Sequence, residues 1–357
     1  MGKAKALAQN HAQLIIPLLA LFALVAFNMI RDPGFFSVGF TQNSDGNTVL
    51  TGNLISIFNS ASELAILAMG MTLVTAASRG QDISVGANAA IAGSIFVSFL
   101  LTGQMTWGAI IAAFLASCAA AMMVGAFNGA LVSVFKIQPM IATLIMFTIG
   151  RSIAYWINGG ATPTLPAGHP TLFLGRFIPG IPIPAPVFIV VFYALIFAIV
   201  LKLTNLGLYA QAVGINEKAA RLNGIDPVRM KLLTFMILGL CVAAAAVIRV
   251  GRLALINHET ILLGIEMDAI LAVAIGGNSL GGGKFNMIGS VIGAYVIQGL
   301  TTTLLAMNVA STDVQAYKAV VIIAIVAIGS PVVKQYAGGF VSRLFNKQRA
   351  PAIRGGV

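Results

Sequence analysis

The sequence predicts an all-α, polytopic bundle of membrane-spanning helices, and three observations carry this prediction. Hydrophobic residues make up 58% of the 357 residues, charged residues only 9%, and long apolar runs recur along the chain. Soluble chains carry roughly a quarter charged residues, so too few charges are present here to cover a water-facing surface. Because one span needs about 20 residues, the apolar content suffices for about ten helices. The alternating strands of a membrane β-barrel are missing from the sequence pattern.

Apolar segments of span-like length follow one another along the chain. They lie at about residues 12–30, 62–78, 84–103, 106–135, 138–158, 185–204, 231–250, 265–280, 286–306 and 315–335. The first segment lacks a small-residue cleavage site, so we interpret it as a signal anchor that is retained. No composition shift divides the chain, and residues 1–357 are predicted to form a single transmembrane domain.

Orientation follows from the lysines and arginines between the apolar segments. With the N-terminus in the cytoplasm, fifteen of the 21 basic residues fall on the inner side. Both termini are therefore predicted inside, as residues 1–11 and 336–357, together with an inner loop over 205–230. The basic residues are scattered and never form a cluster of five or six, so no nucleic-acid partner is predicted. The long segments 31–61 and 158–184 are predicted outside.

The inner loop is predicted to hold one short amphipathic helix. It runs roughly from Asn216 to Asn223, and Gly224 supplies the helix stop. Taken by itself, such a charged helix is better explained as a solvated cytoplasmic face.

Two glycine-rich breaks interrupt the apolar pattern and form a weak internal repeat. They read Arg79-Gly80-Gln81-Asp82-Ile83-Ser84-Val85-Gly86 and Gly276-Gly277-Asn278-Ser279-Leu280-Gly281-Gly282-Gly283-Lys284. Irregular backbone at membrane depth is tolerated only against protein or a watery cavity, and transporters place paired breaks near the substrate path. The alternative is two ordinary cytoplasmic turns. Asp82 is interpreted either as part of a hinge or gate, or with Ser84 as the cap of the following helix.

Several charged or polar residues lie inside the predicted spans. Glu63, Glu266 and Asp268 are candidates for a polar conduit, with Lys318 and Arg151 as partners, because ionisable residues at membrane depth are costly. Local hydrogen bonding and snorkelling are the alternative. The uncharged set is interpreted mainly as glue between helices rather than as ligand contacts: Asn88, Asn128, Thr143, Thr148, Asn158, Gln298 and Thr301 to Thr303.

Enzyme chemistry has little support in the sequence. The phosphate-loop pattern GxxxxGK[ST] fails at Asn278 and Phe285. The three histidines are far apart, and Cys118 and Cys241 have no metal-ligand or disulfide spacing. The chain is therefore not expected to hydrolyse nucleotide, to bind a metal or to carry a cofactor.

Four segments in order resemble one transporter family. Met69-Gly70-Met71-Thr72-Leu73-Val74 with the first break is similar to the GMTLVI and GGIDLSVG segments of permease subunits in bacterial ABC importers for ribose and related sugars. The segment Val213 to Ile225 resembles the cytoplasmic coupling loop, Met267 to Gly283 the second break, and Tyr317 to Val321 the last span. The resemblance covers about residues 55–335. The segments at 136–139, 142–144 and 150–151 are most similar to galactofuranose permeases.

The resemblance implies an importer in the bacterial inner membrane that moves a pentose or hexose, including furanose forms. It implies three partners: a periplasmic or lipid-anchored sugar-binding protein, a second permease subunit in a homodimer or heterodimer, and a separate ABC ATPase that holds ATP and Mg. Membrane lipid surrounds it. The coupling residues would be Asn216, Glu217, Ala219, Ala220, Arg221 and Gly224. The gate residues would be Arg79, Gly80, Asp82, Ser84, Gly86, Gly276, Gly277, Ser279, Gly282 and Gly283, with Glu266 and Asp268 along the pathway.

One departure and one alternative accompany this resemblance. Arg79 and Gln81 stand where the family usually has Gly and Ile, which makes the first break more polar and positively charged. The alternative function is an ion- or proton-coupled secondary transporter, in which Asp82, Glu266 or Asp268 would titrate or bind the coupling ion.

Overall fold

The computed structural model describes residues 2–42, 47–102 and 106–329, and it confirms the all-α membrane bundle. Within these residues, seven helices are long and apolar enough to span a membrane. These are α2 (Asn53–Ser78), α3 (Val85–Thr102), α4 (Trp107–Ser133), α5 (Pro139–Ile157), α6 (Ala185–Leu203), α9 (Pro227–Leu253) and α11 (Met287–Ala306). The helices α1 (Gly2–Arg31) and α12 (Val314–Gly329) flank them in the chain, each with a shorter apolar stretch.

One predicted span differs from the structure. The segment 265–280 holds only α10 (Ile265–Ile275), a helix of 11 residues. At 1.5 Å per residue it is about 16 Å long, roughly half of the hydrocarbon thickness. Gly264, with φ 79°, precedes the helix, and the second glycine-rich break follows it. Apolar composition alone did not distinguish this short helix from a full span.

Two further differences lie in the loops. The inner loop holds two helices, α7 (Leu206–Ile215) and α8 (Glu217–Leu222), where the sequence predicted one. Asn216 separates them in an extended conformation. The segment 31–61 contains an antiparallel hairpin of β1 (Gly39–Gln42) and β2 (Thr48–Thr51) and the start of α2. The proline-rich segment 158–184 holds one 3-10 turn, η1 (Pro170–Gly175).

The centre of the bundle is formed by α2 and α9, which pack against each other and, on the α9 side, against α4. Every residue of α2 from Ala61 to Ser78 is buried. Glycines allow α4 and α9 to touch backbone to backbone: a Cβ at Gly239 would overlap the Ala121 carbonyl, and one at Gly125 would overlap that of Phe235. Membrane helices associate through such small residues because lipid removes the hydrophobic driving force between them.

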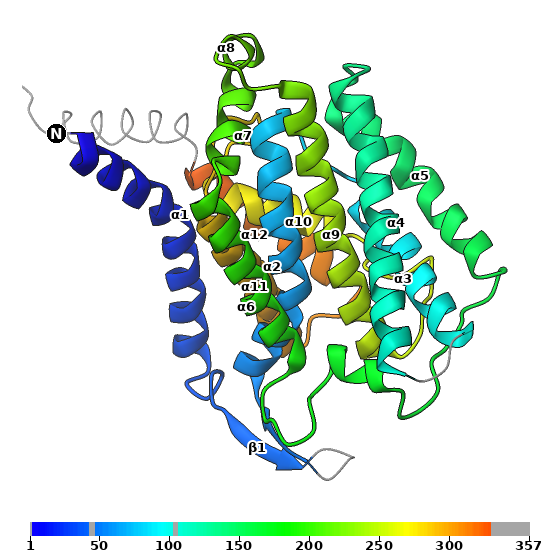
Figure 1. Ribbon diagram of the computed structural model, residues 1–357. Helices are drawn as coiled ribbons and strands as arrows, with labels where there is room; N and C mark the ends of the chain where they lie inside the picture. The colour runs from blue at the N-terminus through cyan, green and yellow to red at the C-terminus, as the bar shows by residue number, and fades with distance from the viewer. Residues whose placement is uncertain (1, 43–46, 103–105, 330–357) are drawn as a thin grey trace, which may run out of the picture.

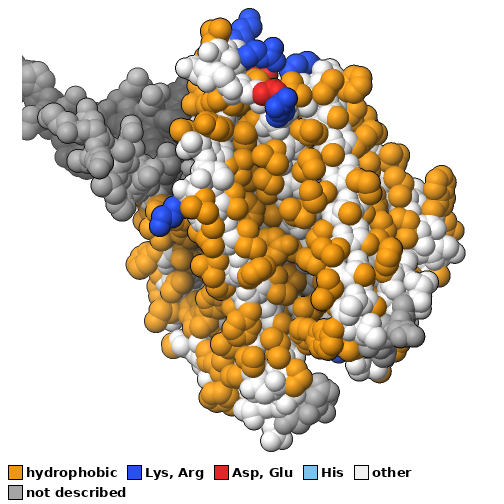
Figure 2. All heavy atoms as spheres, in the orientation of Figure 1, with side chains coloured by type: hydrophobic (Ala, Val, Ile, Leu, Met, Phe, Trp, Pro, Cys, Tyr) orange, Lys and Arg blue, Asp and Glu red, His pale blue; other side chains and the backbone are white. Residues whose placement is uncertain are grey.

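The outer surface of the bundle is apolar. Helix α6 buries few of its residues and exposes large side chains such as Phe192 and Leu203. Figure 2 shows hydrophobic side chains over most of the visible face, while basic side chains gather at the end that carries α8. This distribution is that expected of a surface in contact with lipid.

The segments that connect the helices lie at the two ends of the bundle. Figure 1 shows α8 at one end of the bundle and β1 at the other. The first break, the second break and α7 meet near α8, through contacts described below. At the other end, the Leu165 amide donates to the Ala254 carbonyl and the Leu50 amide to the Pro182 carbonyl. The alternation agrees with the predicted order of inner and outer loops.

Candidate functional site

The exposed helix α8 is built as a rigid unit by local capping. The Asn216 side chain accepts hydrogen bonds from the amides of Lys218 and Ala219 at 3.0 and 3.1 Å. The helix ends before Gly224, whose φ of 80° favours glycine. These two features confirm the predicted helix and its stop.

The predicted coupling residues lie on different faces of α8. Ala219 and Arg221 are exposed, whereas Ala220 is buried and packs into the core, so Ala220 is not available to a partner. Two exposed apolar residues were missed by the sequence reasoning: Leu222, 89% exposed, and Ile215, 64% exposed. Apolar side chains exposed at the most polar end of the molecule are a signal of a contact surface.

Glu217 connects α8 to the transmembrane helices. Its carboxylate accepts a hydrogen bond from Lys231, near the start of α9, and lies 3.8 Å from the ammonium of Lys136, between α4 and α5. Partial burial by itself raises the pKa of Glu217, but the Lys231 hydrogen bond and the charges of Lys231, Lys136 and Arg79 outweigh it and lower the pKa below its ordinary value. Glu217 is therefore ionised and paired at neutral pH.

The first break is buried inside the protein rather than exposed as a turn. Gly80, Asp82 and Ser84 are buried, and a Cβ at Gly80 would overlap the Pro139 ring at the start of α5. The Ile83 amide donates to the hydroxyl of Thr143 on α5 at 3.2 Å. The break is thus packed against other parts of the protein. Irregular backbone at membrane depth requires such packing.

Asp82 is held by hydrogen bonds at the start of α3. Its Oδ1 accepts from the amide and the hydroxyl of Ser84 at 2.8 and 2.6 Å, and its Oδ2 accepts from Asn128 of α4 at 3.3 Å. Asn128 also donates to the Ser84 hydroxyl at 2.8 Å. These hydrogen bonds support the interpretation of Asp82 as a helix cap. Asn128 connects α4 to the start of α3, as expected for a polar contact between helices.

Arg79 and Gln81 connect the first break to two other segments. The Arg79 guanidinium donates from Nε to the Gly214 carbonyl at 2.5 Å and from Nη2 to the Ile215 carbonyl, at the C-terminus of α7. Cations are favoured there because the last carbonyls of a helix lack partners. The Gln81 amide donates to the Leu280 carbonyl of the second break at 2.7 Å. Arg79 and Gln81, the two residues that depart from the family pattern, therefore connect the first break to α7 and to the second break.

The second break is a loop at the α8 end of the bundle, and side-chain hydrogen bonds hold its conformation. The Asn278 side chain accepts from the Asn286 amide at 2.6 Å and donates to the Ser290 hydroxyl at 2.8 Å. Asn286 caps α11 through the Gly289 amide. The Gly283 amide donates to the Ala76 carbonyl of α2 at 3.1 Å, and the hydrogen bond from Gln81 to Leu280 brings the two breaks into contact. The structure brings them together although about 200 residues separate them.

Gly86 marks the point where α3 meets the first turn of α10. A Cβ at this position would lie 2.7 Å from Glu266 Oε2, 2.9 Å from the Leu262 carbonyl and 3.1 Å from Arg151 Nη2. Only glycine allows this approach. Arg151 donates to the carbonyls of His258 and Ile261. Among the residues that the structure describes, none donates a hydrogen bond to the buried Glu266 Oε2. The expected neighbourhood of Glu266 and Arg151 is present, without a direct ion pair.

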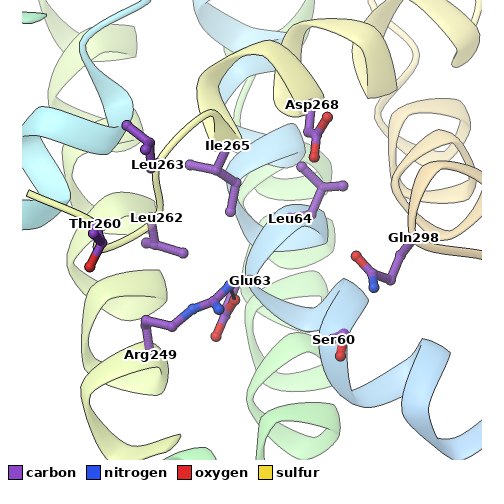
Figure 3. A pocket seen from close by; sticks show the side chains of 10 residues that line it. All are labelled: Ser60, Glu63, Leu64, Arg249, Thr260, Leu262, Leu263, Ile265, Asp268 and Gln298. Carbon is purple, nitrogen blue, oxygen red and sulfur yellow. Dashed lines mark hydrogen bonds and ion pairs between the residues drawn. The ribbon is translucent and has the colours of Figure 1, made fainter. Parts of the chain in front are cut away.

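The remaining acids lie towards the end opposite α8. Asp268 accepts a hydrogen bond from Lys318 at 2.7 Å, the partner that the sequence suggested. Glu63, fully buried, accepts from Arg249, and Arg252 lies 3.6 Å away. Arg249 and Arg252, near the end of α9, were not among the partners that the sequence suggested. Figure 3 shows the Arg249 guanidinium beside the Glu63 carboxylate, at the edge of a cavity that Asp268 and Gln298 also line.

Metal chemistry has no visible centre in the part of the chain that the structure describes. Among residues 2–42, 47–102 and 106–329, no group of three or more His, Cys, Asp or Glu side chains could hold a metal ion. Cys118 and Cys241 are buried free thiols.

Comparison with known proteins places the chain in a transporter family. Residues 53–329 match the family described as branched-chain amino acid transport system / permease component. The chain is 36% identical to the galactofuranose transporter permease protein YtfT of Escherichia coli (strain K12), over 88% of each chain. It is 32% identical to the fructose import permease protein FruF of Bifidobacterium longum (strain NCC 2705), over 98% of this chain and 99% of that one.

A third relative agrees. The ribose import permease protein RbsC of Escherichia coli (strain K12) is 35% identical, over 87% of this chain and 92% of its own length. No solved structure matches the chain. The family match covers most of the chain, including both breaks and α8, and the protein is a member of the branched-chain amino acid transport system / permease component family.

Proposed function

We propose that this protein is the permease subunit of a bacterial ABC importer that moves a sugar across the inner membrane into the cytoplasm. The observation that carries the proposal is that relatives named for galactofuranose, fructose and ribose are each at least 32% identical over 87% or more of the chain. A pentose or hexose, including furanose forms, is the proposed substrate class. The substrate would arrive from a solute-binding protein at the end that carries β1 and β2.

A separate ABC ATPase, with ATP and Mg, would dock at α8. The exposed side chains of Ile215 and Leu222 offer apolar contact, and Arg221 offers charge. The ion pairs of Glu217 with Lys231 and Lys136 would carry movement of α8 to α9 and to the connection between α4 and α5. In this proposal residues 1–11, 205–230 and 336–357 are cytoplasmic; the last of these lies outside the described residues.

The two breaks would form the cytoplasmic gate. Arg79 touches the carbonyls that immediately precede α8, and the neighbouring Gln81 contacts the second break. Displacement of α8 would therefore act on the gate through hydrogen bonds to backbone, without passing through the centre of the bundle. Two permease subunits, identical or related, would complete the path.

The secondary-transporter alternative needs an acid free to titrate. Asp268 is paired with Lys318, Glu63 with Arg249, and Asp82 is held by Ser84 and Asn128. Glu266, with a buried Oε2 that lacks a donor, is the acid among these that fits such a role. Uptake driven by an ion gradient and reduced by Glu266→Gln would favour that alternative.

The proposal is tested by purifying the tagged chain from its native membrane in mild detergent. Mass spectrometry of the eluate should identify an ATPase subunit, with or without a second permease, and the eluate should hydrolyse ATP. Proteoliposomes made from this complex should take up sugar with internal ATP and no ion gradient. Uptake that persists without the ATPase and collapses with the gradient would contradict the proposal.

The link through Arg79 has its own test. In Arg79→Ala, binding-protein-stimulated ATP hydrolysis should continue while the amount of sugar imported per ATP falls. The matched control is Arg176→Ala at the opposite end, an exposed arginine that also donates to backbone carbonyl oxygen. Equal sugar per ATP in wild type and Arg79→Ala would exclude this route of coupling.

A further inference from the structure

A polar cavity lies among four helices at the end opposite α8. Its volume is about 170 Å³, and α2, α9, α10 and α11 contribute to its wall together with the loop before α10. Figure 3 shows Glu63 and Arg249 facing each other on one side, with Gln298, Ser60 and Asp268 around the same space. The sequence suggested Glu63 and Asp268 for a polar conduit and interpreted Gln298 mainly as a contact between helices, whereas it proposed no such role for Ser60 or Arg249.

Polar atoms directly behind the cavity wall have unused hydrogen-bonding capacity. Glu63 is fully buried; its Oε2 accepts from Arg249, but its Oε1 has no hydrogen-bond donor within the described part of the chain. The Nε of Arg249 is likewise buried without an acceptor. Leaving such groups unmatched away from water is expensive. Both atoms are buried, so a ligand would reach them once the two side chains turn towards the cavity. A hydroxyl group both donates and accepts, so adjacent hydroxyls would then satisfy the acceptor Oε1 and the donor Nε together.

The acids around the cavity are balanced by basic partners. Glu63 is paired with Arg249 and lies near Arg252, and Asp268 is paired with Lys318. No lining acid is left without a cation, which makes the cavity unsuited to a cation and disfavours a coupling ion. A neutral, hydroxyl-rich ligand agrees with this balance, because it adds hydrogen bonds without adding a net charge to bury.

The apolar part of the wall limits the ligand further. Leu64, Leu262 and Ile265 are buried and line the cavity beside the polar groups. A small ligand site of this kind combines an apolar wall with a few placed polar groups. The apolar C–H faces of a sugar ring would rest on this wall, while its hydroxyls would meet the polar side.

We propose that this cavity is a transit subsite that holds one monosaccharide on its way through the permease. Glu63, Arg249 and Gln298 would contact the hydroxyls, and Asp268, fixed by Lys318, would close the site. This inference rests on the proposed function as a sugar importer and adds the place and the residues of substrate contact.

Gln298 gives the sharpest test, because its side-chain amide contributes to the cavity wall and has no hydrogen-bond partner among the described residues. Gln298→Leu keeps the approximate volume and removes only the hydrogen-bonding group. Gln315→Leu is the matched control, since Gln315 is exposed on α12 and does not line the cavity. The complete transporter, with its ATPase and loaded binding protein, is reconstituted into proteoliposomes, and uptake of radiolabelled ribose, fructose and galactose is measured together with ATP hydrolysis.

At saturating loaded binding protein, Gln298→Leu should lower the uptake of the transported sugar roughly fivefold, as expected for one lost hydrogen bond. Binding-protein-stimulated ATP hydrolysis should stay at the wild-type level, and Gln315→Leu should match wild type in both. Equal sugar per ATP in the Gln298→Leu and wild-type proteins would overturn the subsite. A parallel loss of uptake and hydrolysis would also overturn it, because it indicates a structural role. If the wild-type complex imports none of the sugars with ATP, the proposed function itself fails.

A second measurement keeps the inference testable if Gln298→Leu does not fold. Gln298→Cys is labelled with a membrane-impermeant thiol reagent in the same proteoliposomes, against the background of Cys118 and Cys241, both buried. Binding protein loaded with ribose, fructose or galactose should slow labelling at least twofold compared with empty binding protein, and Gln315→Cys should show no difference. Labelling rates at position 298 that do not respond to any loaded binding protein would contradict occupancy by the sugar.

Discussion

The two ends of the molecule carry charge in different ways. At the end with β1 and β2, the Glu63 carboxylate is fully buried between Arg249 and Arg252. At the α8 end, the side chain of Glu217 is 34% exposed; of its two partners, Lys136 is 55% exposed and Lys231 is buried. A buried pair is costly to break because one partner is left as an unpaired charge, whereas an exposed pair is worth little. The first arrangement fixes geometry, and the second permits movement.

The largest effect is expected from breaking the buried cluster. Glu63→Ala leaves Arg249 and Arg252 without a counter-charge and should lower the free energy of unfolding by about 3–5 kcal/mol. Thermal unfolding of the detergent-solubilised protein measures this change. Glu259→Ala, at a side chain that is 77% exposed, is the matched control and should unfold as wild type does. Similar curves for all three proteins would show that the buried pair is not structural.

A smaller effect is expected at the first break, where the partners of Asp82 are uncharged. Asp82→Ala and Asn128→Ala should each cost about 1–3 kcal/mol, since each leaves a buried polar group unmatched. The double variant should cost less than the sum of the two, because one hydrogen-bonded network is lost in either case. Thermal unfolding of the four proteins measures the coupling.

The same variants separate folding from selectivity. Asp82→Ala should change stability or gating while the order of preference among the imported sugars remains. An altered sugar profile with full expression would contradict the hinge interpretation of Asp82.

At the α8 end, the expected effect is on coupling rather than on folding. Glu217→Lys opposes Lys231 and Lys136 with a like charge, at an expected cost of about 1 kcal/mol. ATP hydrolysis should continue, sugar import per ATP should fall, and membrane insertion should remain intact. Gly224→Phe should act in the same direction, because φ of 80° is strained for any residue with a Cβ. Glu259→Lys, a charge reversal at the other end, is the control; normal uptake in the two α8 variants would remove the coupling assignment.

The smallest effect is the pH dependence of the Glu217 link. The folded pKa of Glu217 lies below its ordinary value, so its contribution to stability is fully present above an unfolded pKa of about 4.3 and is lost as the pH falls through the folded value. Because the group is partly exposed, we expect less than about 1 kcal/mol. Thermal unfolding of wild type and Glu217→Gln between pH 7 and pH 3 should show a difference that shrinks below about pH 4.3. A constant difference over this range would exclude the ionised pair as its source.

Much of this molecule could be predicted from local sequence. The apolar runs predicted most of the long helices, and the charged segment closed by Gly224 predicted α8. The hydrogen bonds that hold the two breaks were harder to predict, because Asn128, Thr143 and Asn278 carry no distinctive local pattern. An amide inside an apolar helix has the same sequence signal whether it joins helices or meets a ligand.

The sequence by itself determined the membrane class, the order of the spans and the position of the two breaks, since hydropathy and glycine content are properties of adjacent residues. Only the tertiary structure decided that α10 is a short helix, that Ala220 is buried, and that Glu63 pairs with arginines of α9 nearly 190 residues away. These outcomes depend on which helices pack together. Packing in a membrane is set by close contact between small residues and by polar pairing over long distances in sequence, and neither leaves a periodic signal in the chain.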